Sequence, residues 1–486
     1  MRADLIAALK GGADLAECRL DFLSAPPGGD DLRRIVADHP DRVIVTYRPA
    51  REGGRWYGPE SQRLKALSDA MALGCLAADV EADVPSRDWP TGQVILSHHD
   101  FTGPMSDLPD WIERLAASDA AVSKVAFLAD GCEDCFRAFD VIRAQTKPVI
   151  ALAMGPHGTA SRILAGKFGA FGTFAALDAG SESAPGQLTL SDMKDLYRWD
   201  RIGPKTALYG VIGCPIAHSM SPAVHNAAFG HLGLDACYVP LLVEPGWDNF
   251  KRFMDALLAR PWLDWRGLSV TIPHKENALR YVGQARCDEL GGRIGAVNTI
   301  TLSPDGSLRG DNTDYSAAVG ALCQAMRIAP ADLASREVAI LGAGGAARSI
   351  VAALRHYGAK VAIYNRTVDR GRQLAQEFGC DAGPLGDVVD AAIVVNCTPL
   401  GMHPRVDACP VRKLGPSVKV VFDTIYNPLQ TRLLELARAA GCVCVSGLEM
   451  FVLQAAAQLE IWTAQQAPVD FMRQTVLRKL AEGNAK

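Results

Sequence analysis

The sequence predicts an α/β protein with two parts: a (β/α)8-type barrel, followed by a two-lobed unit whose second lobe is Rossmann-like. Three observations support this prediction. Short apolar strands alternate with helical patterns over the first 200 residues, which is typical of parallel β/α sheets. That alternation stops near Gly203 and Pro204. Residues 337–367 then form a complete pattern of strand, glycine turn, helix and strand. At 486 residues the chain is long enough for two or three hydrophobic cores.

Seven strand-like runs precede the change of pattern, and helical patterns such as DLPDWIERLAA lie between them. The runs are residues 14–20, 42–48, 76–82, 94–100, 122–128, 147–154 and 170–176. A closed β/α barrel needs eight strands. Before the first run there is room only for the helix RADLIAALKGG, so we expect the first barrel strand to be absent. Either the start site lies late in this sequence, or another segment fills the gap.

The same changes of pattern place the domain boundaries. We expect the barrel over residues 1–200, a linker over 201–206, and an α/β lobe over 207–318. The Rossmann-like lobe follows over 319–445, and helices over 446–486 return to the preceding lobe.

Composition and charge exclude several classes of protein. The chain is 49% hydrophobic and 21% charged, with 50 basic and 54 acidic residues and a net charge of −4. Because no long basic run is present, we expect neither a nucleic acid nor an anionic membrane as a partner. No uninterrupted apolar stretch reaches the about 18 residues of a membrane span. Asp4 and Lys10 make the N-terminus unlike a signal peptide.

The 13 cysteines are scattered without the spacing of a disulfide framework, which favours a reduced, cytoplasmic location. Cys132 and Cys135 form one CxxC pair, and Cys442 and Cys444 form a CxC pair. Neither has a second pair or nearby histidines, although structural zinc needs four ligands. We therefore interpret them as ordinary thiols and expect no metal.

A dinucleotide site is predicted where a strand, VAIL, runs into a glycine turn and a helix. The turn consists of Gly342, Ala343, Gly344, Gly345 and Ala346. Such a turn lets the backbone approach a pyrophosphate and directs N–H groups at it. The alternative is a tight turn without a ligand.

The end of the following strand predicts the type of cofactor. It has Asn365, Arg366, Thr367 and then Arg370, where NAD-binding proteins usually have an acidic residue. A guanidinium can bind a 2′-phosphate, whereas a carboxylate would repel it. We therefore expect NADP(H) rather than NAD(H), unless these are ordinary surface arginines.

Residues 207–480 resemble the shikimate dehydrogenase family in the order and spacing of eight motifs. These are VIGCPIAHSMSPAVHN, LSVTIPHKE, GAVNTI, GDNTDY, GAGGAARS, NRT, NCTPLGM and GLEMFVLQAA. The resemblance implies that Ser219 and Ser221 hold a substrate carboxylate. It also implies that Thr271, Asn298, Tyr426 and Gln454 contact its ring hydroxyls or carboxylate, and that Thr398 borders the nicotinamide. Ser269 stands where the family often has Asn, so we assign it no contact.

The same resemblance implies that Lys275 and Asp314 form the catalytic pair. Reduction of a ketone builds negative charge on oxygen, which needs a nearby proton or positive charge. Lys275 offers both, and Asp314 would position its ammonium group. The alternative is a surface ion pair. We interpret His274, next to Lys275, as a packing residue.

Lys124 is the candidate catalytic residue of the barrel, because a lysine within the apolar strand VSKVAFL is costly unless it is used or paired. A lysine that attacks a carbonyl must first lose its proton, which burial and nearby cations favour. Arg19, Arg48 and Arg162 are such cations, and they also suit a substrate that bears a carboxylate.

Residues 3–200 resemble type I 3-dehydroquinate dehydratase through AECRLD, VTYRPAREGG, ILSHHDF, SKVAFL, ALAMGPHGTASR and SAPGQLT. The resemblance implies an eight-stranded barrel in which Lys124 forms an imine with the substrate ketone and His99 moves the protons. Glu52 would orient His99. The remaining implied contacts to substrate come from Glu17, Arg19, Arg48, Arg162, Ser183 and Gln187, the last two on a loop that closes the site.

Two neighbouring histidines follow the strand VILS, where the family usually has Asn before the catalytic His. Strand alternation places His98 and His99 on opposite faces. We therefore expect that they do not line one site and do not share a metal ion. His99 is predicted to be the catalytic base, and His98 a structural substitution.

Together the two resemblances imply consecutive reactions on one chain. Dehydration of 3-dehydroquinate would be followed by NADPH-dependent reduction of 3-dehydroshikimate to shikimate, with small molecules as the partners. Alternatives are a chain active only in its dehydrogenase half, or a quinate dehydrogenase fused to another Schiff-base enzyme such as an aldolase. A non-catalytic sensor of the same metabolites is disfavoured by the presence of Lys124, His99, Lys275 and Asp314 together.

Overall fold

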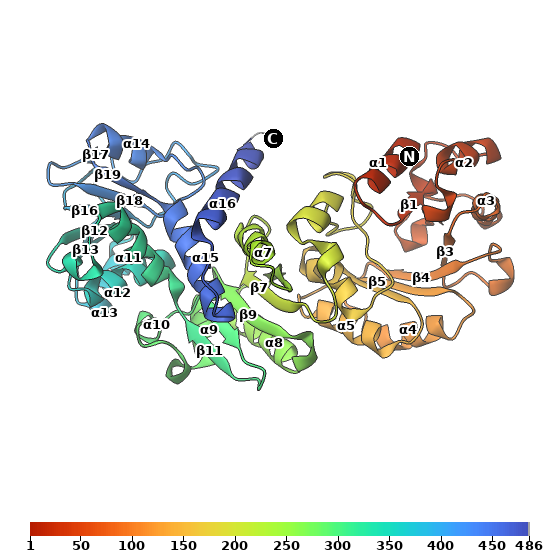
Figure 1. The fold of residues 1–486 in the computed structure, drawn as a ribbon, viewed down its shortest axis with the longest axis horizontal. Helices are drawn as coiled ribbons and strands as arrows, with labels where there is room; N and C mark the ends of the chain where they lie inside the picture. The colour runs from red at the N-terminus through yellow and green to blue at the C-terminus, as the bar shows by residue number, and fades with distance from the viewer. Residues whose placement is uncertain (485–486) are drawn as a thin grey trace. The chain divides into compact units, whose positions relative to one another are not determined.

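The structure, a computed structural model that describes residues 1–484, forms two compact units (Figure 1). The first comprises residues 1–207 with 235–244 and 252–263, and the second begins at Leu208 and takes the other residues. The two short segments of the first unit fall within the lobe that the sequence places at 207–318.

The first unit contains an open half-barrel: six parallel strands in the order β1-β2-β3-β4-β5-β6. The strands are Ala16–Arg19, Val43–Thr46, Ala77–Glu81, Val94–Asp100, Val122–Leu128 and Val149–Met154. Their apolar residues are buried because helices cover one face and a small core, including Ile44, Ile95 and Ile150, fills the other. The helices are α1 (Arg2–Lys10), α2 (Gly29–Val36), α3 (Glu60–Ala72), α4 (Leu108–Ala116), α5 (Asp134–Ala144) and α6 (Thr159–Ile163).

The predicted seventh strand, residues 170–176, does not form. This segment makes one backbone hydrogen bond to β6, from Phe171 N to Val149 O at 2.8 Å, and one bridge from Ala176 to Thr189. A barrel strand needs a partner on each side. The first described residues form α1 beside β1 instead of a strand, so no second partner for 170–176 occurs within residues 1–484. Of the seven barrel strands that the sequence predicts, six form, and the first unit contains an open six-stranded half-barrel.

A mixed five-stranded sheet follows, in the order β11-β10-β9-β7-β8. Its strands are β7 (Ala207–Gly213), β8 (Ala236–Leu242), β9 (Trp265–Val270), β10 (Thr299–Leu302) and β11 (Leu308–Asp311). β7 and β9 are parallel, whereas β10 is antiparallel to both of its neighbours. The helices of this region are α7 (Ser221–His231), α8 (Trp247–Leu258), α9 (Lys275–Val282) and α10 (Glu289–Ile294).

The predicted Rossmann-like lobe is confirmed by a six-stranded parallel sheet in the order β14-β13-β12-β16-β18-β19. Its strands are β12 (Glu337–Leu341), β13 (Lys360–Asn365), β14 (Asp381–Pro384), β16 (Ile393–Asn396), β18 (Val420–Asp423) and β19 (Val443–Ser446), with β15 (Val388–Val389) and β17 (Lys413–Leu414) paired separately. The helices are α11 (Thr313–Met326), α12 (Gly345–His356), α13 (Val368–Phe378), α14 (Arg432–Ala439), α15 (Gly447–Thr463) and α16 (Val469–Asn484). Two apolar clusters, one on each face, hold the sheet between these helices.

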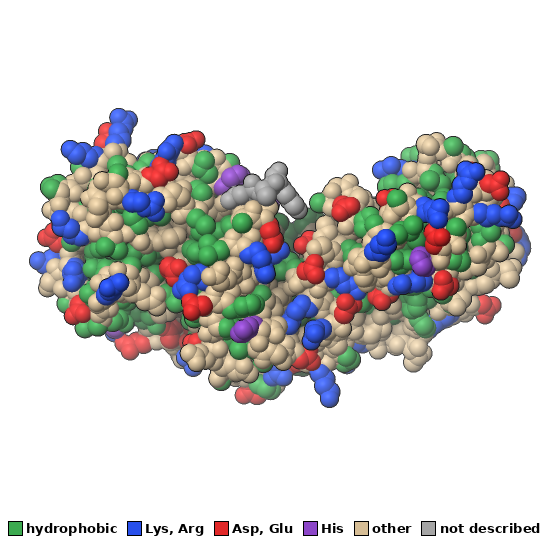
Figure 2. Space-filling model, turned by 45° about the horizontal axis from the view of Figure 1, so that its top comes forward, with side chains coloured by type: hydrophobic (Ala, Val, Ile, Leu, Met, Phe, Trp, Pro, Cys, Tyr) green, Lys and Arg blue, Asp and Glu red, His purple; other side chains and the backbone are tan. Residues whose placement is uncertain are grey.

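Surface and covalent features are unexceptional. On the face shown in Figure 2, basic and acidic side chains are interspersed. Within residues 1–484 no helix combines the length and hydropathy that crossing a bilayer requires. All 13 cysteines are free.

Candidate active sites

All nine side chains predicted for the barrel site line one pocket. They are Glu17, Arg19, Arg48, Glu52, His99, Lys124, Arg162, Ser183 and Gln187. Most of them stand on or directly after parallel strands, whose carboxyl ends meet at one edge of the sheet. The half-barrel therefore assembles the complete predicted set without a first strand.

Lys124 is buried, with 4% of its surface exposed, on β5. Its Nζ lies 2.7 Å from Oδ2 of Asp79 and 3.8 Å from Oε1 of Glu17. The ring centroid of Phe174 is 4.3 Å from the same nitrogen. The sequence led us to expect cations as the nearest groups, but the nearest groups are carboxylates. A lysine must lose its proton before it attacks a carbonyl, and these carboxylates hold the nitrogen that does so.

Asp79 on β3 was missed by the sequence analysis. Besides Lys124 it binds Arg48, whose Nη2 lies 2.7 Å from Oδ1, and Ser97, whose hydroxyl donates to Oδ1 at 2.6 Å. Arg48 also pairs with Glu81 at 2.7 Å. Arg48 was predicted to contact substrate, but its guanidinium is largely occupied in positioning these carboxylates. The sequence AADVE could have indicated Asp79, because it places two acidic residues, two positions apart, inside a buried strand.

Glu52 binds both histidines of the HH pair. Its Oε1 lies 3.3 Å from Nδ1 of His98 and its Oε2 lies 3.0 Å from Nδ1 of His99. The two histidines therefore share a carboxylate, which strand alternation did not predict, but of the two it is His99 that lines the pocket. They do leave β4 on opposite faces, with His98 stacked on Trp111 of α4 at 3.7 Å. Glu52 lies at the end of the strand, where both rings reach it.

The turn that holds Glu52 requires a glycine after it. Gly53 has φ +75°, and a Cβ there would lie 2.4 Å from the ring of Phe101. This turn keeps Glu52 only 8% exposed beside the pocket.

Electrostatics keep His99 neutral and Glu52 charged. Burial, and then the charge of Arg48, lowers the pKa of His99 to about 3, against the opposing effect of Glu52. Burial alone would raise the pKa of Glu52, but hydrogen bonds from His98 and His99 and the charge of Arg48 bring it to about 2. At neutral pH, Glu52 can therefore accept the Nδ1 proton of His99 in a hydrogen bond, which leaves Nε2 free to take a proton.

These two pKa shifts predict acid sensitivity of the first unit. As pH falls below about 6.5, an unfolded chain protonates this histidine while folded His99 stays neutral, so stability is lost. Glu52 acts in the same direction below about pH 4.3. In calorimetry from about pH 7 to about pH 5, His99→Gln should show a smaller fall in melting temperature than the unsubstituted chain. The exposed control His39→Gln should match the unsubstituted chain, and an equal fall in all three would contradict this account.

Arg162 is the arginine of this pocket best suited to bind an anion. It is 2% exposed, and its recorded partner is a backbone carbonyl, Pro185 O, at 3.3 Å from Nη2. Its Nε has no hydrogen-bond partner among the described residues. Burial lowers the pKa of Arg162 to about 10. A buried cation without a carboxylate partner is costly, and a bound carboxylate would compensate it.

The loop predicted to close the site carries Ser183 and Gln187, which are bound to each other. Ser183 N donates to Oε1 of Gln187 at 2.8 Å, and Gln187 Nε2 donates to the Ser183 hydroxyl at 3.2 Å. Both side chains line the pocket from this loop.

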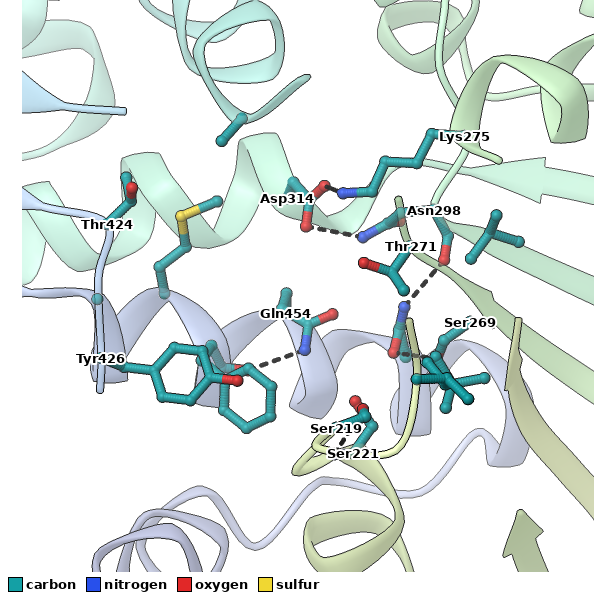
Figure 3. A pocket seen from close by; sticks show the side chains of 18 of the residues that line it. Ser219, Ser221, Ser269, Thr271, Lys275, Asn298, Asp314, Thr424, Tyr426 and Gln454 are labelled. Carbon is teal, nitrogen blue, oxygen red and sulfur yellow. Dashed lines mark hydrogen bonds and ion pairs between the residues drawn. The ribbon is translucent and has the colours of Figure 1, made fainter. Parts of the chain in front are cut away.

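A second pocket, of about 420 Å³, lies in the second unit and holds all eight predicted substrate and catalytic residues of the dehydrogenase-like part (Figure 3). They are Ser219, Ser221, Thr271, Lys275, Asn298, Asp314, Tyr426 and Gln454. Ser219 and Ser221 lie across the pocket from Lys275 and Asp314. Ser221 begins α7, and the N-terminus of such a helix favours an anion.

Lys275, at the start of α9, forms an ion pair with Oδ2 of Asp314 on α11. Asn298 fixes the other oxygen, donating from Nδ2 to Oδ1 at 2.9 Å. The side-chain Oδ1 of Asn298 in turn accepts from the backbone N–H of Thr313 at 2.8 Å. The ammonium group is thus held at the edge of the pocket, where it can protonate a developing alkoxide.

Several lining residues were not predicted. Ser269 donates to Oε1 of Gln458 at 2.7 Å, and Gln458 Nε2 donates to Asn298 O at 3.2 Å. Ser269 therefore supports Asn298 indirectly.

Tyr426, one of the predicted residues, packs against Phe451 with 4.8 Å between ring centroids. Burial raises the pKa of its hydroxyl, which therefore stays protonated and can donate a hydrogen bond.

The nucleotide turn has the conformation that the glycine pattern predicts. Gly342 has φ +107°, and a Cβ there would lie 3.1 Å from Cys397 and Thr398. Gly344 caps α12, and an added Cβ at Gly344 or Gly345 would meet open space, so a ligand could approach the backbone. These features fit a dinucleotide. Ala346 also lines the second pocket, which places the turn beside the predicted substrate residues.

The predicted 2′-phosphate residues lie at the end of β13. Asn365 ends the strand, and Thr367 precedes α13. Arg366 and Arg370 form no ion pair within residues 1–484. Among these residues no cluster of three or more His, Cys, Asp or Glu could hold a metal ion.

Comparisons with known proteins match each part of the chain in turn. The type I 3-dehydroquinase family matches residues 1–204. The shikimate dehydrogenase substrate-binding domain matches 211–300, the shikimate/quinate 5-dehydrogenase family 324–398, and the shikimate 5′-dehydrogenase C-terminal domain 447–477.

A relative that spans both parts decides the family. The chloroplastic bifunctional 3-dehydroquinate dehydratase/shikimate dehydrogenase of Arabidopsis thaliana is 40% identical over 483 residues, covering 94% of this chain and 79% of the relative. The chain belongs to this bifunctional family. The NADP(+) shikimate dehydrogenase of Methanosarcina barkeri is 40% identical and covers 56% of this chain and 98% of its own length.

Solved structures resemble the second part. A shikimate dehydrogenase in complex with NADP+ is 36% identical, covers 57% of this chain and 96% of its own length, and has a TM-score of 0.50. A ligand-free 5-ketofructose reductase of Gluconobacter sp. strain CHM43 is 30% identical, covers 56% of this chain and 99% of its own length, and has the same TM-score of 0.50. The fold alone therefore does not fix the substrate, which must be argued from the pocket.

Proposed function

We propose that the chain catalyses two consecutive steps of the shikimate pathway: dehydration of 3-dehydroquinate and NADPH-dependent reduction of 3-dehydroshikimate to shikimate. The observation that carries this proposal is that each predicted residue set converges in a pocket of its own. Lys124 and His99 line the first pocket, and Lys275 and Asp314 line the second. A chain of this bifunctional family that retains both sets has what both reactions need.

In the first pocket, the Lys124 amine attacks the C3 ketone of 3-dehydroquinate and water leaves, which forms an imine. The imine withdraws electrons from C2, so His99 can take a proton from C2 through Nε2. His99 then returns a proton to the C1 hydroxyl, which leaves as water. Hydrolysis of the imine releases 3-dehydroshikimate and restores Lys124. Asp79 Oδ2 lies 2.7 Å from Nζ and would orient the amine in these steps.

Charge in the first pocket matches an acid substrate. Arg162 would hold the carboxylate, since it is buried and forms no ion pair with a carboxylate within residues 1–484. Glu17, which accepts a hydrogen bond from Thr46 at 2.8 Å, would accept one from a substrate hydroxyl. The loop with Ser183 and Gln187 would close over the bound ring.

In the second pocket, the substrate would span the distance between two polar ends. Ser219 and Ser221 would bind the carboxylate, helped by the N-terminus of α7. Lys275 would donate a proton to the ketone oxygen while Asp314 and Asn298 hold its ammonium group in place. NADPH, bound over the turn that begins at Gly342, supplies the hydride.

Arg366 and Arg370 are proposed to select NADP(H) over NAD(H). Arg366→Ala should lower kcat/KM for NADPH by about tenfold to a hundredfold, because one charge-assisted phosphate contact is lost. The same variant should leave the NADH reaction almost unchanged. Arg372→Ala is a matched control, since Arg372 is also an exposed arginine but lies further along α13 and pairs with Asp369 at 3.3 Å. Equal loss with both cofactors would contradict a 2′-phosphate role.

A panel of substrates and cofactors tests the proposed function against its rivals. The purified chain should dehydrate 3-dehydroquinate, should oxidise shikimate faster than quinate, and should prefer NADP+ to NAD+. A preference for quinate, or aldol cleavage at the barrel, would favour the rival enzymes. Binding without turnover in either half would favour a sensor.

Thirteen free cysteines suit a reducing compartment such as the cytoplasm.

A further inference from the structure

The carboxylate of Glu52 lies between two imidazoles, and this arrangement gives His98 a function beyond packing. Glu52 Oε1 is 3.3 Å from His98 Nδ1, and Oε2 is 3.0 Å from His99 Nδ1. Both distances suit an N–H donor to a carboxylate. Each carboxylate oxygen thus has its own histidine, and a movement of either ring moves the group that orients the other.

We propose that His98 is a positioning residue of the dehydratase site, which fixes Glu52 against His99. This proposal rests on the proposed dehydratase function. His98 is not required to touch the substrate, because it does not line the pocket that holds Lys124 and His99.

The fold restrains His98 from both sides. Its ring stacks on the indole of Trp111 with 3.7 Å between centroids and 10° between planes. On β4 it pairs in register with Val125, while His99 pairs with Ala126 on the same strand β5. The stacked ring can therefore present Nδ1 to Glu52 in one orientation, which a smaller amide side chain would not share.

The two oxygens of Glu52 are held from different directions. Oε2, which faces His99, also lies 3.9 Å from Nη1 of Arg48. Oε1 lies 3.3 Å from Nδ1 of His98. The hydrogen bond from His98 therefore fixes the end of the carboxylate that points away from His99.

The consequence is an effect on proton transfer and not on substrate binding. Without the hydrogen bond from His98, the carboxylate of Glu52 could turn, and His99 would be held less well for removal of the C2 proton. A loss of His98 should therefore lower kcat and leave KM almost unchanged.

Two substitutions separate the hydrogen bond from the ring. His98→Asn keeps an N–H donor, whereas His98→Phe keeps a ring for Trp111 but has no donor. Dehydratase kcat and KM would be measured for both. The dehydrogenase activity of the same samples reports whether the rest of the chain is intact.

His98→Phe should lower kcat by about tenfold with KM nearly unchanged, since a hydrogen bond to a charged group is removed. His98→Asn should lose less kcat than His98→Phe, because an amide N–H can still reach Glu52. A loss in His98→Asn as large as that in His98→Phe, or a loss confined to KM, would overturn the positioning role. Failure of the unsubstituted chain to dehydrate 3-dehydroquinate would instead overturn the proposed function.

Discussion

Replacement of Lys124 with Met should abolish dehydration of 3-dehydroquinate, with kcat reduced at least about 10,000-fold. Methionine has nearly the same length but no amine, so no imine can form. The effect should be this large because the imine is the electron sink for every later step. Asp79 keeps its ion pair with Arg48 at 2.7 Å, so the variant does not leave this buried carboxylate unpaired.

The measurement is dehydratase turnover together with borohydride trapping. With 3-dehydroquinate and borohydride, the unsubstituted chain should gain a covalent mass on Lys124, and Lys124→Met should gain none. Lys124→Arg is the matched control for charge, because it restores a cation beside Asp79 but still cannot form an imine. Recovery of dehydration in Lys124→Arg, or an adduct on another lysine, would contradict the imine mechanism. Dehydrogenase activity in the same samples should be normal.

Replacement of Lys275 with Met should reduce the rate of 3-dehydroshikimate reduction by about 1,000-fold, because the developing alkoxide loses its proton donor and its nearest positive charge. The loss should appear mainly in kcat, since Ser219 and Ser221 still bind the carboxylate at the other end of the pocket. The measurement is NADPH oxidation at saturating 3-dehydroshikimate. Dehydration by the same sample should be near normal.

Asp314→Asn is the matched variant for this experiment. It retains the shape of the side chain and its contact with Asn298, but removes the charge that faces Lys275. We expect a smaller loss than in Lys275→Met, because the amine is still present but less well held. Equal loss of both activities in Lys275→Met would mean that the two sites are not independent.

Sequence reasoning was most successful for the Rossmann-like lobe. Its strands are buried on both faces and its turns have glycines with a fixed purpose, as at Gly342 with φ +107°. It was least successful for the barrel, where residues 170–176 look like a strand but find a partner only on the side of β6. Apolar composition shows that a segment can form a strand. Whether it forms one also depends on neighbouring strands with which it can pair.

The candidate sites, too, could be predicted from the sequence only in part. Each predicted substrate and catalytic residue lines one of the two pockets, because motif residues follow strands whose ends converge. The sequence did not reveal the partners that reach across strands, such as Asp79 beside Lys124 and Gln458 beside Ser269. Nor did it reveal that Glu52 binds both His98 and His99, since strand alternation describes side chains along a strand and not a carboxylate beyond its end.

The most direct test of the central claim is conversion of 3-dehydroquinate to shikimate by the purified chain alone, followed through NADPH oxidation and product mass. The account predicts that 3-dehydroquinate and NADPH give shikimate without any added enzyme, and that Lys124→Met and Lys275→Met each stop the overall conversion. Mixed together, these two variants should restore it, because each retains one site. No shikimate from 3-dehydroquinate, while added 3-dehydroshikimate is still reduced, would contradict a working dehydratase in this half-barrel.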